Sequence, residues 1–138
     1  VLFFIFIRDR RDIVVFLLSV LVGEVIVTAF KTLASRARPI DNYLAITGPT
    51  SFPSGHAMIA VLFYGLAMYM LVHTATSKIE KNVIIALGTM IIFLIGFSRL
   101  YLGVHYLSDV VGGFALGISI LLLFIIIFKS WYTRGIKL

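Results

Sequence analysis

Long apolar runs alternate with short polar segments along this sequence. The runs cover residues 13–30, 57–73, 82–97 and 109–128. At 1.5 Å per helical residue each run reaches about 24–30 Å, close to the ~30 Å hydrocarbon core of a bilayer. A single run of this length could be a buried helix of a soluble protein. Four of them in 138 residues predict an all-α bundle of helices that crosses a membrane several times.

The composition agrees with a membrane protein of one domain. Hydrophobic residues make up 61% of the chain and charged residues 13%, whereas soluble domains carry about a quarter charged residues. We expect residues 1–138 to form a single transmembrane domain. Residues 1–7 are apolar but too short to span, so we interpret them as the end of a helix that begins upstream. The sequence has no cysteine, which excludes disulfides and thiolate metal sites.

Basic residues lie at the ends of the apolar runs rather than in a stripe, and the net charge is +6. Nucleic acid is therefore not expected as a partner. If the runs span alternately, eight of the twelve Lys and Arg residues fall on one side, which the positive-inside rule makes cytoplasmic. These eight are Arg8, Arg10, Arg11, Lys78, Lys81, Lys129, Arg134 and Lys137. The cations that remain on the outer side indicate that something anionic binds there: Lys31, Arg36, Arg38 and Arg99.

The first polar segment on the outer side carries Lys31 and Arg38, followed by Pro39. Lys31 and Arg38 are seven residues apart, which is two helical turns, so both can lie on one face. Pro39 disfavours helix at Arg38, so we expect the chain to leave the helix there. The two cations either bind an anion or extend their charged ends to the membrane interface.

The second segment, Ser51-Phe52-Pro53-Ser54-Gly55-His56, directly precedes the second run. Ser54 fits the N-cap of a helix. The same geometry points free backbone N–H groups and the positive end of the helix dipole outward, which suits a phosphate oxygen. Gly55 would let that oxygen approach the backbone closely. The segment is either an ordinary cap or an anion site with His56 beside it.

The third segment runs from Ser98 to Asp109 and contains Arg99 and His105. If it is helical, His105 and Asp109 are neighbours on one face because they are four residues apart. The carboxylate would then accept the imidazole N–H, fix the tautomer and leave the other ring nitrogen free to attack. Alternatively the pair only satisfies two polar groups inside the membrane, although ionisable residues in a span are functional candidates.

Together the three segments read K-x6-RP, PSGH and SR-x5-HxxxD, in this order, with apolar runs between them. They resemble the signature of the type 2 phosphatidic acid phosphatase family at every motif position between Lys31 and Asp109. The resemblance implies a polytopic bundle of about six transmembrane helices, so one or more helices would precede Val1. It also implies a multi-pass cell-membrane enzyme that removes phosphate from a lipid through a phosphohistidine, with its active site on the outer side.

The resemblance assigns a role to each motif residue. His105 is the nucleophile, Asp109 orients it, and His56 is the general acid for the leaving oxygen. The phosphate oxygens are held by the other motif residues, Lys31, Arg38, Ser54, Gly55 and Arg99. No metal or cofactor is expected, since cations clamp the phosphate and the outer side shows no carboxylate cluster for Mg²⁺. The expected partners are a lipid phosphate and bilayer lipids, with no obligatory protein partner.

Several residues stay outside the motifs. Arg36 could contact either the substrate or a lipid headgroup. Glu24 lies mid-span, and we expect it to point into the bundle, either to support the site or to form an interhelical hydrogen bond. Gly113 and Gly117 are spaced for close helix packing inside the subunit. The remaining ones are expected at the membrane interfaces: His73, Tyr101, Tyr106 and Trp131.

Two other functions are compatible with the same motifs. Vanadium haloperoxidases share them and bind vanadate where phosphate would lie, but they are soluble, so four spanning runs disfavour them. A non-enzymatic protein that binds or transports a lipid phosphate could use the same anion site. The motifs do not distinguish among the lipids used by bacterial relatives, which are phosphatidylglycerol phosphate, undecaprenyl pyrophosphate and phosphatidic acid.

Overall fold

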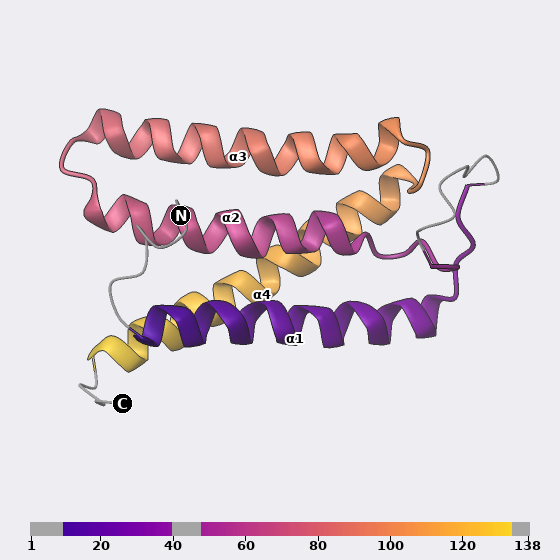
Figure 1. Cartoon of the computed structure of the whole chain (residues 1–138), viewed down its shortest axis with the longest axis horizontal. Helices are drawn as coiled ribbons and strands as arrows, with labels where there is room; N and C mark the ends of the chain where they lie inside the picture. The colour runs from indigo at the N-terminus through magenta and orange to yellow at the C-terminus, as the bar shows by residue number, and fades with distance from the viewer. Residues whose placement is uncertain (1–9, 40–47, 134–138) are drawn as a thin grey trace.

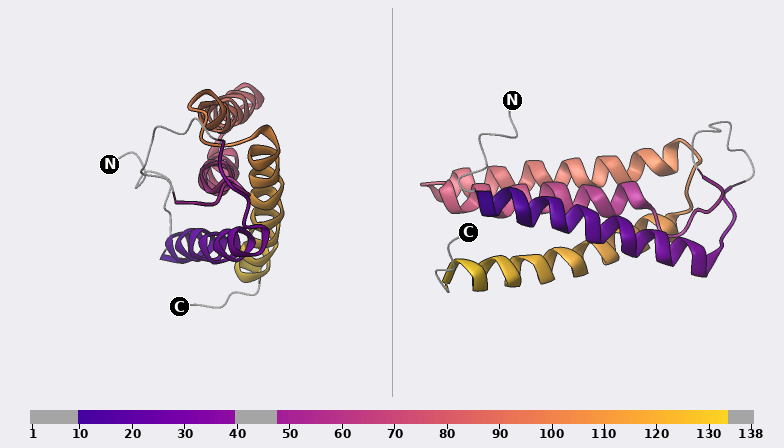
Figure 2. Two further views of the ribbon diagram at one scale, coloured as in Figure 1. Left: turned by 90° about the vertical axis from the view of Figure 1, so that its right-hand side faces the viewer. Right: turned by 60° about the horizontal axis from the view of Figure 1, so that its bottom comes forward.

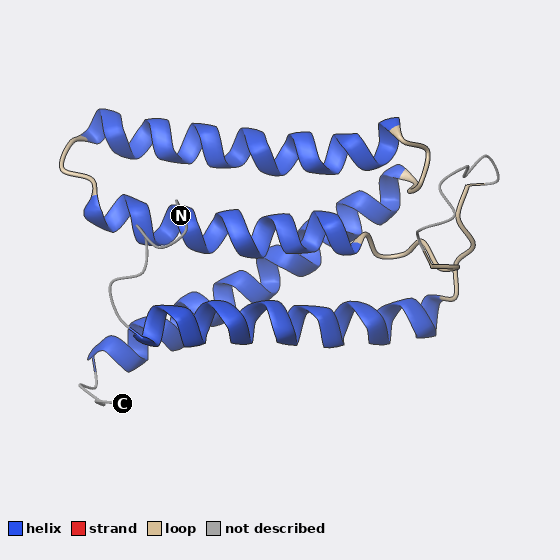
Figure 3. Cartoon of the chain, viewed as in Figure 1, coloured by secondary structure: helices blue, strands red, loops and turns tan. Residues whose placement is uncertain are grey.

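The computed structural model describes residues 10–39 and 48–133. Within them four helices form, α1 (Arg10–Ala34), α2 (Gly55–Thr74), α3 (Lys78–Tyr101) and α4 (Leu107–Thr133) (Figure 1). Each helix contains one of the predicted apolar runs and is long and apolar enough to cross a membrane. The predicted all-α transmembrane bundle is thereby confirmed, and Figure 3 shows how little of the described chain lies outside helices.

The helices extend beyond the apolar runs because polar residues cap them. At the start of α3, the Ser77 hydroxyl accepts a hydrogen bond from the Glu80 amide at 3.1 Å, and the Glu80 carboxylate accepts one from the Ser77 amide at 3.3 Å. This reciprocal capping box satisfies two backbone N–H groups that the helix itself leaves unpaired. Ser77 is therefore the N-cap, and residues 78–81, which precede the apolar run, form the first turn of α3.

α2 lies at the centre of the bundle and contacts each of the other three helices. α1 and α3 lie on either side of it and do not contact one another along the described helices, as the views in Figure 2 show. α4 crosses the other helices at an angle and packs along α2. α2 is accordingly the most buried of the four spans.

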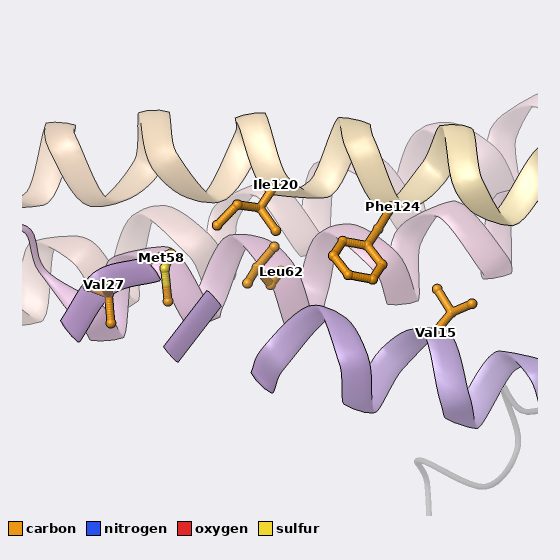
Figure 4. Close-up of a cluster of buried hydrophobic side chains, with 6 residues drawn as sticks. All are labelled: Val15, Val27, Met58, Leu62, Ile120 and Phe124. Carbon is orange, nitrogen blue, oxygen red and sulfur yellow. The ribbon is translucent and has the colours of Figure 1, made fainter. Parts of the chain in front are cut away.

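The apolar core lies between α1, α2 and α4. Six side chains from these helices meet there: Val15, Val27, Met58, Leu62, Ile120 and Phe124 (Figure 4). A stripe of buried residues in α1 is spaced four apart and therefore lies on one face of the helix. The stripe consists of Val15, Ser19, Gly23 and Val27. The other faces of α1 carry exposed apolar side chains such as Leu21 and Val25, which suit lipid rather than water.

Two glycines of α4 allow its backbone to approach α2 closely. A Cβ atom at Gly113 would collide with the backbone carbonyl oxygen of Ser54, and one at Gly117 would lie 2.9 Å from the carbonyl oxygen of Met58. Both contacts are between helices of the same chain. The prediction that this small-residue pair packs helices inside the subunit is confirmed.

The antiparallel order of the helices brings the three polar segments to one end of the bundle. The carboxyl ends of α1 and α3 and the amino ends of α2 and α4 meet there, at the right of Figure 1. The opposite end contains the start of α1, the connection between α2 and α3, and the end of α4. Lys78, Lys81 and Lys129 lie at that opposite end.

We predict that Gly113→Ala destabilises the protein, because the new methyl group meets a backbone carbonyl that cannot turn aside. The free energy of unfolding should fall by about 1–3 kcal/mol, as at other overpacked sites. The loss would appear as a lower thermal unfolding midpoint in detergent. Gly88→Ala is the matched control, since the atoms nearest to its methyl group belong to the Met68 side chain, which can turn aside, and not to the backbone. Equal midpoints for the two variants would contradict the backbone clash.

Candidate active site

His105 is placed by the way α3 ends. Gly103 adopts a left-handed conformation with φ 65°, which a glycine adopts without steric cost. The Gly103 amide donates to the Leu100 carbonyl at 2.9 Å, and the Val104 amide donates to the Arg99 carbonyl at 3.3 Å. These two bonds close the last turn of the helix in the manner of a glycine C-cap. His105 follows directly and is buried.

Residues 98–109 do not form one helix, so the helical spacing considered for His105 and Asp109 does not apply. α3 ends at Tyr101 and α4 begins at Leu107, so His105 lies in the connection between them. The sequence contained a signal for this break, Gly103, which our motif reading passed over. The two side chains are nevertheless neighbours, because Asp109 is in the first turn of α4 and its side chain reaches back to His105. Nδ1 and Oδ2 are 3.6 Å apart, so the predicted hydrogen bond itself is not formed.

Asp109 is completely buried, and each of its carboxylate oxygens has a partner. Oδ2 accepts a hydrogen bond from the Tyr106 amide at 2.8 Å. Oδ1 accepts one from Arg36 Nη1 at 2.9 Å. A buried carboxylate needs such partners, because its charge is otherwise very costly to remove from water. Asp109 is therefore held in one orientation beside His105.

Arg38 contacts the other nitrogen of the His105 ring. Its Nη1 lies 3.3 Å from Nε2 and also donates to the Val104 carbonyl at 2.7 Å. A guanidinium can only donate hydrogen bonds, so Nε2 must present its lone pair. In the neutral ring the proton is then on Nδ1, the nitrogen that faces Asp109. This is the tautomer that leaves Nε2 able to act as a nucleophile.

The charge state of His105 favours the same chemistry. Burial lowers the pKa of His105 to about 4, and the Arg38 charge adds to this effect while Asp109 opposes it. The imidazole is therefore neutral at neutral pH, with the Nε2 lone pair available.

Arg38 reaches His105 from a loop and not from α1. The helix ends at Ala34, and Ser35 takes a left-handed conformation with φ 42°. The prediction that Lys31 and Arg38 share a helical face is therefore wrong, and the helix ends earlier than Pro39 alone suggested. The two cations are still close enough for the charge of Arg38 to act on Lys31.

The second polar segment is paired with the loop that follows α1. Ala37 and Thr50 form an isolated antiparallel bridge. The Ser51 amide donates to the Arg36 carbonyl at 2.8 Å, and the buried Ser51 hydroxyl donates to the Ala37 carbonyl at 3.0 Å. This pairing fixes the loop that carries the two arginines against the segment that precedes α2.

Ser54 connects the second and third segments. It is buried at the N-cap of α2, where its hydroxyl accepts from the Ala57 amide at 3.5 Å. Its own amide donates to the Asp109 carbonyl at 2.9 Å. The structure thus gives Ser54 the capping role. The amides of Gly55 and His56 precede the first helical hydrogen bond of α2, and such groups are suited to an anion.

His56 and the remaining cations surround the amino end of α2. The His56 side chain is exposed, and the charges of Arg99, Lys31 and Arg38 all act on it. Lys31 is in the last turn of α1 and Arg99 in the last turn of α3. Arg99 also donates from Nε to the Ser98 hydroxyl at 3.1 Å. The structure therefore brings every motif residue to the same end of the bundle.

Arg36 has contacts that neither of our sequence hypotheses included. Its Nη1 donates to Asp109 Oδ1 and, at 2.6 Å, to the Ser108 hydroxyl. Its guanidinium carbon lies 4.2 Å from the centre of the Tyr106 ring. The sequence pattern gave no indication of these contacts, because Arg36 and Asp109 are 73 residues apart.

Other residues outside the motifs have separate outcomes. Glu24 is exposed on α1, so the prediction that it points into the bundle is wrong, because the packed stripe of α1 lies beside it. Its charge nevertheless acts on Lys31 and His56. His73 packs against Tyr69, with ring centres 4.7 Å apart, at the opposite end of α2 from His56. The side chain of Trp131 lies outside the described part of the chain.

Comparison with known proteins agrees with the motifs. A sequence profile described as the PAP2 superfamily matches residues 12–132. The chain belongs to the PAP2 superfamily. This is the family that the sequence motifs resemble. Among the described residues of this PAP2 chain, no three His, Cys, Asp or Glu side chains come together in a group that could hold a metal ion.

Individual relatives of this PAP2 chain include named phosphatases. Phosphatidylglycerophosphatase B of Bacillus subtilis (strain 168) is 37% identical over 119 residues, covering 86% of this chain and 59% of that protein. Undecaprenyl-diphosphatase of Sulfolobus acidocaldarius is 31% identical over 122 residues, covering 84% of this chain and 55% of that protein. The chain therefore spans less than two thirds of the length of these relatives.

A solved structure has the same arrangement of helices. The crystal structure of the first transmembrane PAP2 type phosphatidylglycerolphosphate phosphatase from Bacillus subtilis superposes with a TM-score of 0.79 at 31% sequence identity. The superposition covers 94% of this chain and 63% of that chain. The transmembrane PAP2 fold is therefore shown for nearly all of the sequence.

We predict that His105 titrates at about pH 4 rather than near 6.5. Its ring should stay neutral down to about pH 5 and gain a proton only in more acidic solution. Asp109→Asn should lower the pKa further, because the carboxylate charge opposes the shift. Nuclear magnetic resonance of ring-labelled histidine in detergent would follow the titration, with His105→Gln used for assignment. A His105 midpoint at or above 6.5 would refute the prediction.

Proposed function

We propose that this protein is an integral membrane phosphatase that hydrolyses a lipid phosphomonoester or a lipid pyrophosphate through a phosphohistidine on His105. The observation that carries the proposal is the buried His105, with Asp109 beside Nδ1 and the Nε2 lone pair directed at a cation. Membership of the PAP2 superfamily and similarity to two named phosphatases support the reaction class.

In the first step Nε2 attacks the phosphorus atom, so that an N–P bond forms and the P–O bond to the lipid breaks. As the substrate enters, the Arg38 N–H would stop donating to Nε2 and would donate a hydrogen bond to a phosphoryl oxygen instead. The cation that covers the lone pair in the free protein thus becomes part of the phosphate clamp. The ring becomes positive during attack, and the carboxylate of Asp109 beside Nδ1–H stabilises that charge.

His56 donates a proton to the lipid oxygen as it leaves. In the second step a water molecule attacks the phosphorus, His56 takes a proton from that water, and the N–P bond breaks to release inorganic phosphate. The exposed position of His56 at the amino end of α2, beside the place where the phosphate would bind, supports this role. The negative charge of the bound phosphate would offset the three nearby cations while His56 carries the proton.

The phosphoryl oxygens are held by side-chain cations and by the start of α2. Lys31, Arg38 and Arg99 supply positive charge where negative charge accumulates. The Gly55 amide adds a backbone donor at the positive end of the helix dipole. Ser54 caps the same turn and can contribute its hydroxyl proton. Because three cations can neutralise the phosphate, we propose that the reaction requires neither metal nor cofactor.

The active site faces the outer side of the cell membrane in this proposal. Lys78, Lys81 and Lys129 lie at the end of the bundle opposite the site, and a basic end is retained in the cytoplasm. The substrate phosphate would then be in the outer leaflet. The names of the relatives favour phosphatidylglycerol phosphate or undecaprenyl pyrophosphate over phosphatidic acid.

The haloperoxidase alternative is not favoured by any contact in the site, and the spanning helices argue against it. Non-enzymatic binding or transport of a lipid phosphate would use the same cations but would not need the His105–Asp109 pair. Replacement of His105 therefore separates a phosphatase from a binding protein.

His105→Ala should abolish turnover of each of the candidate lipids, because removal of a covalent nucleophile costs several orders of magnitude. Acid-quenched labelling with a phosphate-labelled lipid should mark the wild-type protein through an acid-labile bond and leave the variant unlabelled. Wild-type activity should survive EDTA. Label that persists in His105→Ala would move the nucleophile elsewhere, and undiminished lipid transfer by the variant would favour the binding protein.

His56→Ala should slow the reaction of a poor leaving group far more than that of a good one. A lipid alkoxide needs a proton to leave, so its phosphoenzyme formation should fall by about 10²–10⁴, the usual contribution of general acid catalysis. Nitrophenolate leaves without a proton, so the burst of nitrophenol from p-nitrophenyl phosphate should be largely retained. The burst must be followed rather than the steady state, because His56 also assists water attack. Equal losses for both substrates would make His56 a phosphate-binding residue only.

A further inference from the structure

Among the Lys and Arg residues that the structure describes, Arg36 is the one that forms an ion pair with the buried carboxylate of the site. Its Nη1 is 2.9 Å from Asp109 Oδ1, while the side chain of Asp109 is completely buried and that of Arg36 is 39% exposed. The motif cations have other partners: Arg38 contacts Gly48, Val104 and His105, and Arg99 contacts Ser98. Arg36 is therefore bound to the residue behind the nucleophile rather than to the face that a phosphate would meet.

The position of Arg36 is fixed from several sides. Its backbone carbonyl accepts the Ser51 amide at 2.8 Å, and its guanidinium stacks on Tyr106 and donates to the Ser108 hydroxyl. Tyr106 and Ser108 flank the start of α4, the same turn that carries Asp109. Arg36 thus ties the loop after α1 to the first turn of α4.

This contact determines which carboxylate oxygen faces His105. With Oδ1 bound to Arg36 and Oδ2 bound to the Tyr106 amide, the carboxylate cannot rotate without losing one of two charge-assisted hydrogen bonds. His105 Nδ1 has no hydrogen-bond partner in the described structure and lies 3.6 Å from Oδ2. A small movement of the ring toward Oδ2 would complete that bond when the ring becomes positive.

We propose that Arg36 is a positioning residue for the phosphohistidine reaction: through Asp109 it orients the His105 ring and limits its basicity, and it does not bind the phosphate. The inference rests on the proposed function for its kinetic part. Arg36 balances the charge of Asp109, so that the carboxylate orients the imidazole without drawing a proton onto it. Together with burial and the charge of Arg38, this keeps the nucleophile neutral in the free protein.

Other charges also act on His105: Arg38 from the loop after α1 and Lys31 from α1 lower its pKa, and Asp109 from α4 opposes them. Arg36 differs from these two cations because its partner is the carboxylate of Asp109 itself. Loss of Arg36 would leave more of the carboxylate charge to attract a ring proton. The pKa of His105 should then rise.

The test compares Arg36→Ala, Arg36→Gln and Arg36→Lys with wild type, with Thr32→Ala as the control because its exposed hydroxyl bonds only to its own helix. In Arg36→Ala we expect the midpoint of the His105 titration to rise by on the order of one pH unit. The titration is followed by nuclear magnetic resonance. The burst from p-nitrophenyl phosphate should slow about 10–100-fold, as when an outer partner of a functional residue is removed. Vanadate should inhibit the wild type because, bound to His105, it imitates the phosphoryl transition state. Its affinity should change little in Arg36→Ala but fall in Arg99→Ala, which removes a phosphate-binding cation.

The conservative variants separate charge from shape. Arg36→Lys keeps the charge beside Asp109 and should restore most of the burst rate and the wild-type midpoint. Arg36→Gln keeps a hydrogen-bond donor without charge and should show the raised midpoint. If Arg36→Ala does not fold, an equal midpoint for the Gln and Lys variants overturns the proposal.

Two further results would contradict the positioning role. Vanadate affinity that falls in Arg36→Ala as much as in Arg99→Ala would make Arg36 a phosphate-binding residue. An unchanged His105 midpoint with a normal burst would mean that Arg36 only fastens the loop. If wild type itself shows no phosphoenzyme, the proposed function fails, but the His105 midpoint still tests the effect of Arg36 on the ring.

Discussion

The buried carboxylate of Asp109 is the interaction on which the rest of the site depends. A charge with no exposure to solvent is tolerated only when partners replace its water. Here the partners come from separate parts of the chain: Arg36 after α1 and the Tyr106 amide before α4. His105 lies beside the same carboxylate. The backbone carbonyl of Asp109 also accepts the Ser54 amide that precedes α2. Satisfying this one residue therefore assembles all three polar segments.

Close approach of two helices makes that assembly possible. Gly113 lets α4 contact the carbonyl of Ser54, one residue before α2 begins. A larger residue would separate the cap of α2 from Asp109 and enlarge the site. α2 packs between α1 and α3. This packing fixes the positions of Lys31, in the last turn of α1, and Arg99, in the last turn of α3, relative to His56. Apolar packing along the bundle thus sets the spacing of the cations at its end.

The electrostatics of the site are consistent with a neutral nucleophile among cations. Burial and Arg38 lower the pKa of His105, while Asp109 partly opposes them. A buried imidazole that remains neutral can attack a phosphate, and the surrounding cations lower the cost of the charge that develops. Because the ring is neutral, Arg38 can direct an N–H at the lone pair of Nε2 without bringing two positive groups together. The charges of the site are thus balanced by the Arg36–Asp109 ion pair together with the cations around His105.

The sequence by itself determined the four spans, the end of the bundle where polar residues gather, and the motif residues, since apolar run length and residue spacing are local properties. It did not determine how the segments fold between helices. The turn at Gly103 and the end of α1 at Ala34 place His105 and Arg38 in loops, where the spacing of the residues alone suggested helices. The contact between Arg36 and Asp109 joins residues 73 positions apart. Only the tertiary structure decided it, because no local pattern records which buried charge a distant arginine will meet.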